Sequence, residues 1–187
     1  MAVTTRERIV TSAMTLMQER GYGPVSIDNI CRAAGVSKGA VFHHFDSKQG
    51  VGVAALDQYC ATLRDHLAAR ATGEPVARVA AFFDALIEVY EGGLLGPNRC
   101  LIGVFGQEQP SSAPDLRAHV GRLFGGWVDA LAERMSDAGA AAPAVLARQA
   151  IAVVEGALIL HAADGDTDAL VATLASYRDL ITTHLNA

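Results

Sequence analysis

Apolar residues at helical spacing begin directly after Thr4 and Thr5, two residues whose hydroxyl groups can cap the start of a helix. Gly21 follows the last periodic residue, and glycine often ends helices because it adopts left-handed backbone conformations without strain. The sequence therefore predicts a first helix that ends at Gly21. Its inner face carries Ile9, Ala13, Leu16 and Met17, and its opposite face carries Arg6, Glu7, Gln18 and Glu19.

Two short helices follow, separated by a sharp turn. Ser26 can cap the first, Gly35 ends it, and Ser37 can cap the second, which begins with KGAVFHHF. Two short helices joined by a glycine-containing turn of three or four residues are typical of a DNA-binding helix-turn-helix. Two helices of an ordinary bundle remain the alternative on this spacing alone. The inner side of the first short helix carries Ile27, Ile30, Cys31 and Ala34.

Longer helices account for most of the remaining chain. Glycine- and proline-containing segments separate them, namely GGLLGPNRC at 92–100, PSSAP at 110–114 and DAGAAAP at 137–143. An all-α fold with about nine helices is therefore expected. The later helices are predicted at about residues 48–71, 75–90, 101–109, 115–135, 144–163 and 166–185.

Composition agrees with helices packed against helices, since 51% of the residues are hydrophobic and only 6% are aromatic. The net charge of −5 argues against a nucleic-acid partner, but the charges are unevenly distributed. Residues 1–50 carry six Lys and Arg against four acidic residues, whereas residues 51–187 carry nine Arg against sixteen acidic residues. The two parts are therefore expected to meet different partners.

The sequence contains no P-loop, strand-linked GxGxxG or HExxH. Its GxSxG string, GVSKG at 35–39, lies between two predicted helices and does not follow a strand, as the nucleophile of a hydrolase would. The later histidines, such as His66 and His119, lack metal-ligand spacing with cysteines or paired acids. A helical enzyme is therefore only a distant alternative, and neither a cofactor nor a metal is expected. An architectural DNA-binding protein without a sensor is a third hypothesis, but the large acidic part would repel the duplex.

Cysteine usage and hydropathy indicate the compartment. Cys31, Cys60 and Cys100 are odd in number, far apart and outside any CxxC pair, which fits a reducing cytoplasm. Charged and polar residues such as Arg148 interrupt the longest apolar stretch, residues 147–163. The first residues contain no apolar run of the signal-peptide type. A cytoplasmic protein without a membrane segment is therefore expected.

The block AAGVSKGAVFHHFDSK at 33–48, preceded by Gly21-Tyr22 and Ser26-Ile27, resembles the DNA-binding domain of the TetR/AcrR family over about residues 5–50. The resemblance implies an all-α protein. Residues 1–50 would form an N-terminal three-helix helix-turn-helix domain that binds DNA. Residues 51–187 would form a C-terminal helical domain for ligand binding and dimerisation. The expected function is that of a repressor released from double-stranded operator DNA by a small-molecule inducer.

The resemblance assigns phosphate contacts to helix starts and base contacts to the second short helix. Ser26 and Ser37 would bind phosphate, since helix N-termini attract anions. Lys38 would reach guanine O6 or N7 in the major groove. Gly39 and Ala40 would let the helix approach the groove closely, with Ala40 against a thymine methyl group.

Four further residues complete the implied DNA contacts. Phe42 stands where the family usually has tyrosine, so a hydroxyl donor to phosphate is missing there. His43 and Lys48 are expected to contact phosphate. His44 is assigned to the same surface, with half-buried helix packing as the alternative. The opposite side of the helix carries Val41 and Phe45, which are expected in the core.

Two copies of so short a recognition helix would have to read a palindrome together, which requires a dimer. The family places its dimer interface on the last two long helices, here about residues 144–163 and 166–185. Part of their apolar stripe must instead belong to the core of one chain. The stripe contains Ala147, Ala150, Ile151, Val154, Leu158, His161, Leu170, Leu174, Tyr177 and Ile181.

The segment RCLIGVFGQE at 99–108 resembles a subset of the family in which a cysteine reacts with electrophiles or oxidants and the modification releases DNA. Cys100 is thus a candidate sensor and the basis of an alternative function. No lysine follows Lys48, and a reactive thiolate needs a nearby cation or helix N-terminus. An inert buried cysteine is the competing interpretation.

A mostly apolar inducer cavity with a few polar groups is expected in each subunit. Inducer binding would shift the population away from the DNA-binding arrangement. Every apolar candidate could instead be ordinary core, since aromatic residues at helical spacing usually are. The candidate lining residues are Phe82, Phe83, Leu86, Tyr90, Cys100, Val104, Phe105, Gln107, Glu108, Trp127, Glu155, Leu158 and His161.

Overall fold

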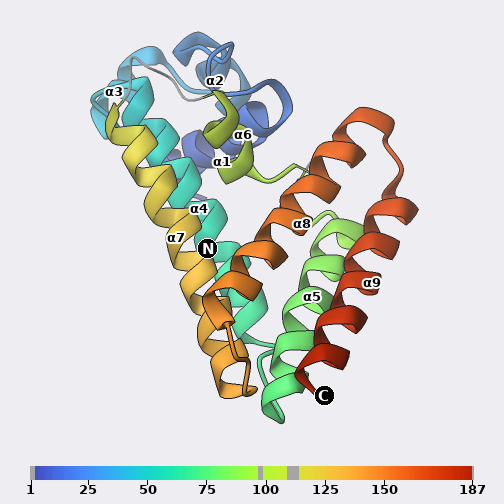
Figure 1. Ribbon diagram of the computed structural model, residues 1–187. Helices are drawn as coiled ribbons and strands as arrows, with labels where there is room; N and C mark the ends of the chain where they lie inside the picture. Colours follow the sequence, from blue (N-terminus) through green and yellow to red (C-terminus); the bar gives the residue numbers. More distant parts are fainter. Residues whose placement is uncertain (1–2, 97–98, 109–113, 187) are drawn as a thin grey trace. The chain divides into compact units, whose positions relative to one another are not determined.

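The computed structural model describes residues 3–96, 99–108 and 114–186, and every regular element in these ranges is a helix (Figure 1). The predicted all-α fold with nine helices is confirmed for the described residues. The predicted end of one helix at Gln109 and most of the PSSAP linker lie outside these ranges. The helices are α1 (Thr5–Arg20), α2 (Ile27–Ala34), α3 (Lys38–His44), α4 (Lys48–Ala68), α5 (Pro75–Gly92), α6 (Leu101–Glu108), α7 (Pro114–Asp137), α8 (Pro143–Asp164) and α9 (Thr167–Leu185).

The chain divides into two compact units. The first unit contains the described residues within 1–61 and 99–123, and the second contains those within 62–98 and 124–187. The borders fall inside α4 and α7, so each of these helices contributes residues to both units. A functional border at residue 50 remains a prediction.

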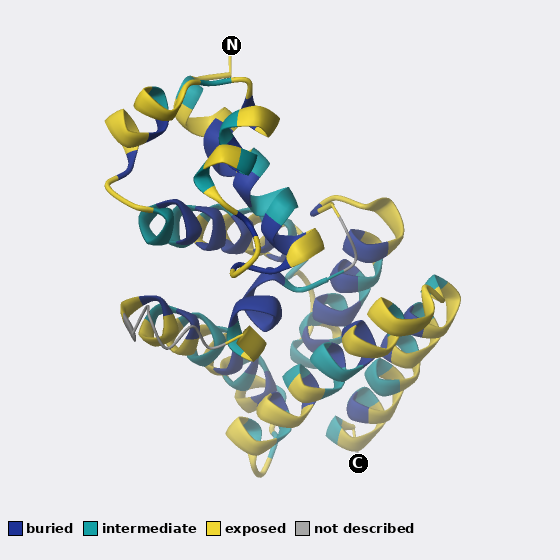
Figure 2. Ribbon diagram, turned by 90° about the horizontal axis from the view of Figure 1, so that it is seen from above, coloured by how far each residue is buried: buried dark blue, intermediate teal, exposed yellow. Residues whose placement is uncertain are grey.

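The helix α1 shows how local sequence starts an element and how tertiary contacts modify it. Thr4 caps the helix through a reciprocal pair of hydrogen bonds with Glu7, as its position predicts. Ala13 and Met17 are fully buried, and the helices carry buried residues along one face (Figure 2). The expectation that Gln18 faces solvent is wrong, because its side chain is fully buried and its amide donates a 2.9 Å hydrogen bond to the carbonyl oxygen of Arg99.

In the second unit, α9 packs along α5 and along α8 (Figure 1). The ring of Phe83 is fully buried on α5 and lies 5.7 Å from the ring of Tyr177 on α9. Arg178 on α9 pairs with Asp84 on α5. Aromatic packing and one ion pair therefore hold α5 and α9 together.

Among the described residues, α8 alone has the length and apolar composition needed to cross a membrane, with a mean hydropathy of 1.6 over its most apolar stretch. Core helices of soluble proteins have the same properties. Its buried residues include Val154 and Leu158. Only 28% of the apolar stretch is buried inside the chain, so α8 presents an apolar surface beyond its own core.

Candidate DNA-binding surface

The connection between α2 and α3 has the geometry of a helix-turn-helix. α2 ends at Ala34, and Gly35 follows in the left-handed region with φ 62°. The amide of Val36 donates to the carbonyl oxygen of Cys31 over 3.0 Å, which closes the turn. Ser37 then adopts an extended conformation and caps α3. The two helices are thus separated by residues 35–37 alone.

Arg8 of α1 braces this turn. Its guanidinium donates hydrogen bonds to the carbonyl oxygens of Ala34 and Gly35, the second over 3.1 Å. A cation suits this position because the carbonyl groups at the end of a helix carry partial negative charge. A Cβ atom at Gly35 would lie 3.0 Å from the Arg8 guanidinium, so glycine also leaves room for the brace.

The helix α3 has a narrow buried side and a broad exposed side. Val41 is fully buried and Phe45, at the end of the helix, is 8% exposed, which confirms their predicted place in the core. Ala40 is half-buried. His44 is exposed, so the alternative of half-buried helix packing does not hold, and its contact with DNA stays a prediction. The exposed residues of this region are Ser37, Lys38, Gly39, Phe42, His43 and His44.

Both candidate serines cap helices. The Ser26 hydroxyl accepts a hydrogen bond from the amide of Asn29 over 3.1 Å and donates to the Asn29 side chain over 2.8 Å. The Ser37 hydroxyl accepts from the amide of Ala40 over 3.1 Å. Both serines are exposed. In Ser37, the hydroxyl acts as an acceptor in this contact and keeps its proton for an acceptor such as a phosphate oxygen.

Lys38 forms an ion pair that its sequence position does not reveal. Its ammonium lies 3.1 Å from the Asp28 carboxylate, and the two side chains are 58% and 67% exposed. Exposed pairs of this kind contribute little to stability. Lys38 can therefore exchange Asp28 for a base edge at low cost.

The ammonium group of Lys48 has more contacts within the chain than that of Lys38. Its ammonium donates a 2.9 Å hydrogen bond to the carbonyl oxygen of Gly23 and lies 4.3 Å from the centre of the Tyr22 ring. Burial lowers the pKa of Lys48, and the nearby Glu108 carboxylate partly offsets this effect. The start of α4 is thus fixed to the turn between α1 and α2.

Arg6 lies beside the end of α3, a position that the sequence pattern does not predict. Its guanidinium carbon is 5.3 Å from the centre of the Phe45 ring, and the residue is exposed. The rings of His43 and His44 lie edge to face, 5.0 Å apart. Arg6 sits on the polar side of the α1 pattern, but only the fold brings it to the end of α3.

The candidate inducer-binding residues fall into both units. In the first unit, Phe105 is 1% exposed and the Glu108 carboxylate accepts a 2.7 Å hydrogen bond from the amide of Gly23. Val104 is buried and Cys100 is half-buried. In the second unit, the buried candidates are Phe82, Phe83, Leu86, Tyr90 and Leu158, and the half-buried ones are Trp127, Glu155 and His161.

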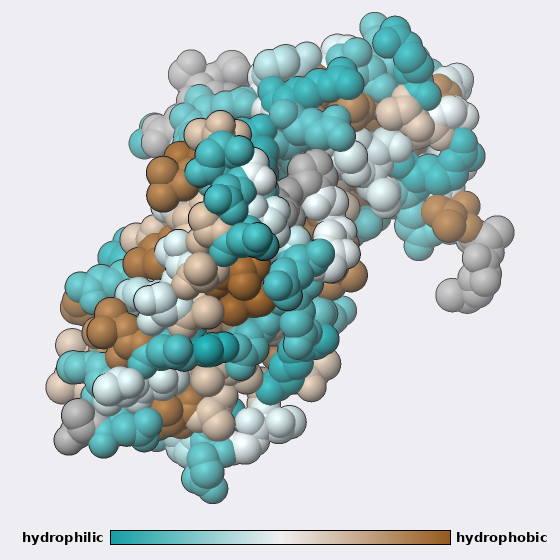
Figure 3. Space-filling view, turned by 90° about the vertical axis from the view of Figure 1, so that its right-hand side faces the viewer, coloured by the Kyte–Doolittle hydropathy of each residue, from teal (hydrophilic) through white to brown (hydrophobic). Residues whose placement is uncertain are grey.

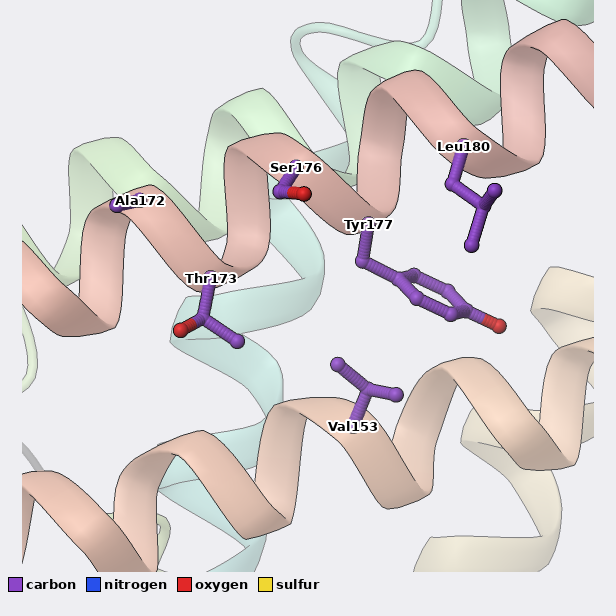
Figure 4. A pocket seen from close by; sticks show the side chains of 6 residues that line it. All are labelled: Val153, Ala172, Thr173, Ser176, Tyr177 and Leu180. Atoms are coloured by element: carbon purple, nitrogen blue, oxygen red, sulfur yellow. The ribbon is translucent and has the colours of Figure 1, made fainter.

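A groove of about 430 Å³ lies between α8 and α9 in the second unit (Figure 4). None of the predicted lining residues borders it. Its walls combine apolar groups with three hydroxyl-bearing residues from α9, one of which is a tyrosine whose ring is directed toward α8 (Figure 4). The described residues contain no group of three or more His, Cys, Asp or Glu arranged to hold a metal ion. The lining residues are Val153, Ala172, Thr173, Ser176, Tyr177 and Leu180.

Two protein-family descriptions match consecutive parts of the chain. Residues 9–55 match bacterial regulatory proteins of the tetR family. Residues 75–175 match the C-terminal domain of LmrA/YxaF-like transcriptional regulators. The first match contains the helix-turn-helix and the start of α4, and the second extends from α5 into α9.

Individual proteins show the same likeness. The HTH-type transcriptional repressor DhaR of Mycobacterium sp. strain GP1 is 31% identical over 66% of this chain and 61% of its own length. The transcriptional regulator AcuR of Cereibacter sphaeroides is 32% identical over 63% of this chain and 54% of its own length. The matches thus span less than two thirds of these relatives. The crystal structure of a TetR transcriptional regulator from Legionella pneumophila is 25% identical, with a TM-score of 0.83, over 96% of this chain and 98% of that one.

Proposed function

The chain belongs to the TetR family of DNA-binding transcriptional regulators, and we propose that it is a repressor released from a palindromic operator by a small-molecule inducer. Family membership makes it a regulator and not an enzyme. The observation that carries the proposal is the exposed face of α3, where Lys38 and Gly39 follow a helix-turn-helix connection of three residues. A relative that is named as a repressor supports repression of transcription over activation. A regulator that binds operator DNA would act in the cytoplasm, as the cysteine usage also predicts.

The exposed residues of the candidate DNA-binding surface are of two kinds, those that would contact bases and those that would contact phosphate. Lys38, Gly39 and Ala40 lie at the start of α3, where a recognition helix meets base edges. Ser26, Ser37 and His43 are exposed and can contact phosphate, together with Lys48 at the start of α4. Phe42 is 47% exposed and contributes apolar surface, and His44 extends the same face.

Replacing Lys38 and Lys48 separately tests this division. Lys38→Ala is expected to change the preferred base at one position of the operator. A side-chain contact to a base edge contributes about 1–3 kcal/mol to the discrimination between bases. Lys48→Ala is expected to weaken binding to all sequences alike and to reduce the steepness of the salt dependence. Fluorescence anisotropy with an operator and single-base variants of it measures both effects.

Arg64→Ala provides the matched control, since it removes an exposed cation that follows Lys48 by 16 residues along α4 and has no assigned DNA contact. This control should bind like the unsubstituted protein. Equal effects of Lys38→Ala and Lys48→Ala on every sequence would refute the division of roles.

We place the dimer interface on the outer side of α8 and α9. Apolar side chains remain exposed on these helices, with Ile159 at 52% and Leu160 and Leu180 at 65%. Figure 3 shows hydrophobic residues, in brown, among polar ones on the face of the molecule that it presents. The groove beside Leu180 continues this surface. A second copy related by a two-fold axis would cover it with the same residues. Much of the predicted stripe is instead buried within its own chain, namely Ala147, Ala150, Val154, Leu158, Leu170, Leu174 and Ile181.

The inducer is expected to be small and mostly apolar. The second unit supplies aromatic and aliphatic side chains such as Phe82, Leu86 and Trp127, with Glu155 and His161 as polar groups. The buried Nδ1 atom of His161 has no hydrogen-bond partner within the described chain, which suits a polar ligand atom. An inducer could bind best to the dimer conformation in which the spacing of the two helix-turn-helix regions does not match the operator. It would then lower the population of the conformation that binds DNA.

A second candidate function uses Cys100 as a sensor of electrophiles or oxidants. The amide of Gly103 in the first turn of α6 donates a hydrogen bond to the Cys100 sulfur over 3.4 Å. Helix N-termini favour the thiolate, which is the reactive form. The neighbouring Arg99 guanidinium is directed instead to the carbonyl oxygens of Gln18 and Glu19.

Mild electrophile treatment followed by mass spectrometry tests this candidate. Modification of Cys100 with loss of operator binding is expected if the cysteine is the sensor, and Cys100→Ser should abolish the response. Cys60 is an internal control because it is 1% exposed and should remain unmodified. An unmodified Cys100 with intact DNA binding would reject the sensor and leave the ligand-induced mechanism.

A further inference from the structure

The segment that leads into α6 is fastened to the end of α1, and all residues involved belong to the first unit. The Arg99 guanidinium donates hydrogen bonds to the carbonyl oxygens of Gln18 over 2.8 Å and Glu19 over 3.0 Å. The buried Gln18 amide donates in return to the carbonyl oxygen of Arg99 over 2.9 Å. One end of α6 is therefore held at the last turn of α1.

The other end of α6 is fastened to the turn that follows α1. The Glu108 carboxylate accepts a hydrogen bond of 2.7 Å from the amide of Gly23. The turn leaves space for this carboxylate, since a Cβ atom at Gly21 would lie 1.8 Å from one Glu108 oxygen and one at Gly23 would lie 3.3 Å from the other. Gly21 also has a φ of +88°, which favours glycine.

Between these two sets of hydrogen bonds, aromatic side chains pack at the contact between α6 and the turn that follows α1. Phe105 of α6 lies 5.1 Å from Tyr22, measured between ring centres, and both residues are buried. The Lys48 ammonium lies 4.3 Å from the Tyr22 ring. A Cβ atom at Gly52 of α4 would lie 3.1 Å from Tyr22 and 3.3 Å from Phe105, so a glycine there permits the close approach. α6, the turn and the start of α4 form one packed cluster.

We propose that Glu108 is a positioning residue for DNA binding, which holds the Gly21–Gly23 turn and, through it, the Lys48 ammonium. Gly23 makes both contacts, because its amide donates to Glu108 and its carbonyl oxygen accepts from Lys48. Loss of the Glu108 contact would release the turn that precedes the Ser26 cap of α2 and free Lys48 from its fixed place. The proposal rests on the proposed DNA-binding role of Lys48 and assigns Glu108 a task other than contacting the inducer.

Two effects of Glu108 on DNA binding have opposite signs. Its hydrogen bond orders the turn and should strengthen binding, whereas its negative charge near phosphate should weaken binding. Glu108→Gln separates them, since the glutamine oxygen can still accept from Gly23 but the charge is gone. Glu108→Ala removes both the acceptor and the charge. The positioning role predicts that only the alanine variant binds operator weakly.

The experiment measures operator affinity at one salt concentration for the unsubstituted protein and three variants. Glu108→Ala is expected to bind about tenfold more weakly, because the Gly23 amide loses its hydrogen-bond acceptor. Glu108→Gln should stay within about threefold, because a neutral hydrogen bond remains and a negative charge near phosphate is removed. Asp115→Ala, which removes an exposed carboxylate on α7 in the same unit, should match the unsubstituted protein. Thermal unfolding of each variant checks that the fold is kept.

Hydrogen exchange of the Gly23 amide, followed by NMR, reports the contact without DNA. The exchange should be faster in Glu108→Ala and nearly unchanged in Glu108→Gln. If the unsubstituted protein binds operator but Glu108→Ala binds equally well or more tightly, the positioning role is overturned and the proposed function stands. If the unsubstituted protein binds no operator, the proposed function and the positioning role both fail, even where Gly23 exchange responds as expected.

Discussion

A Gly39→Leu variant is expected to lose operator-specific binding by about 10³-fold while its fold remains intact. Gly39 is exposed near the start of α3, and a Cβ atom there would meet only the Ser37 hydroxyl, at 3.8 Å. Leucine also favours a helix over glycine by about 0.8 kcal/mol, so the melting temperature should not fall. In the complex, the larger side chain would keep the helix from the groove floor and leave only non-specific binding.

The matched control is Gly121→Leu. Gly121 is exposed on α7, and a Cβ atom there would meet no other atom within 4 Å. The same chemical change should therefore leave operator affinity unchanged. Anisotropy titrations and thermal melts of both variants provide the comparison. Operator binding by Gly39→Leu at the unsubstituted affinity would show that α3 does not approach bases closely.

A Leu180→Glu variant is expected to be monomeric and to bind the full palindrome about 10³-fold more weakly, since one protomer reads only half of the site. Leu180 is 65% exposed and borders the groove between α8 and α9, so its replacement should cost the single chain little stability. Two-fold symmetry would place the new carboxylates of both copies within one apolar interface, where burying unpaired charges is costly. Analytical ultracentrifugation and operator titration measure the two effects.

Leu94→Glu is the control for this change, because Leu94 is 49% exposed but lies after α5, outside α8 and α9. It should remain dimeric and bind operator normally. A dimeric Leu180→Glu protein with normal affinity would exclude this surface as the interface. The apolar side of α8 would then need another partner, and binding to lipid vesicles would identify a membrane as that partner.

Local sequence was sufficient to predict where the early helices begin and end. Thr4, Ser26 and Ser37 cap helices through short-range hydrogen bonds, and Gly35 adopts the left-handed conformation that its residue type favours. These contacts lie within a few residues of sequence. Helical spacing likewise identified Val41 as a core residue within the recognition helix.

Contacts between residues far apart in the chain could not be predicted from local sequence patterns. Gln18 lies on the polar side of the α1 pattern, yet it is buried because Arg99, 81 residues later, provides its partner. The contact between Glu108 and Gly23 spans 85 residues. Lys48 is a surface lysine by sequence, and only the folded turn shows that it is held by Gly23. The inducer candidates were least predictable, because apolar spacing is the same in a cavity wall and in a core.

A dimer of this chain is proposed to bind a palindrome through α3. The most direct measurement is titration of the unsubstituted protein against a palindromic fragment from the neighbourhood of its own gene, a half-site and a scrambled duplex, at several salt concentrations. We expect two protomers on the palindrome, much weaker binding to the half-site and scrambled duplex, and affinity that falls steeply with salt. Equal binding to all three duplexes, or no binding at low salt, would contradict recognition of a palindrome by a dimer of this chain.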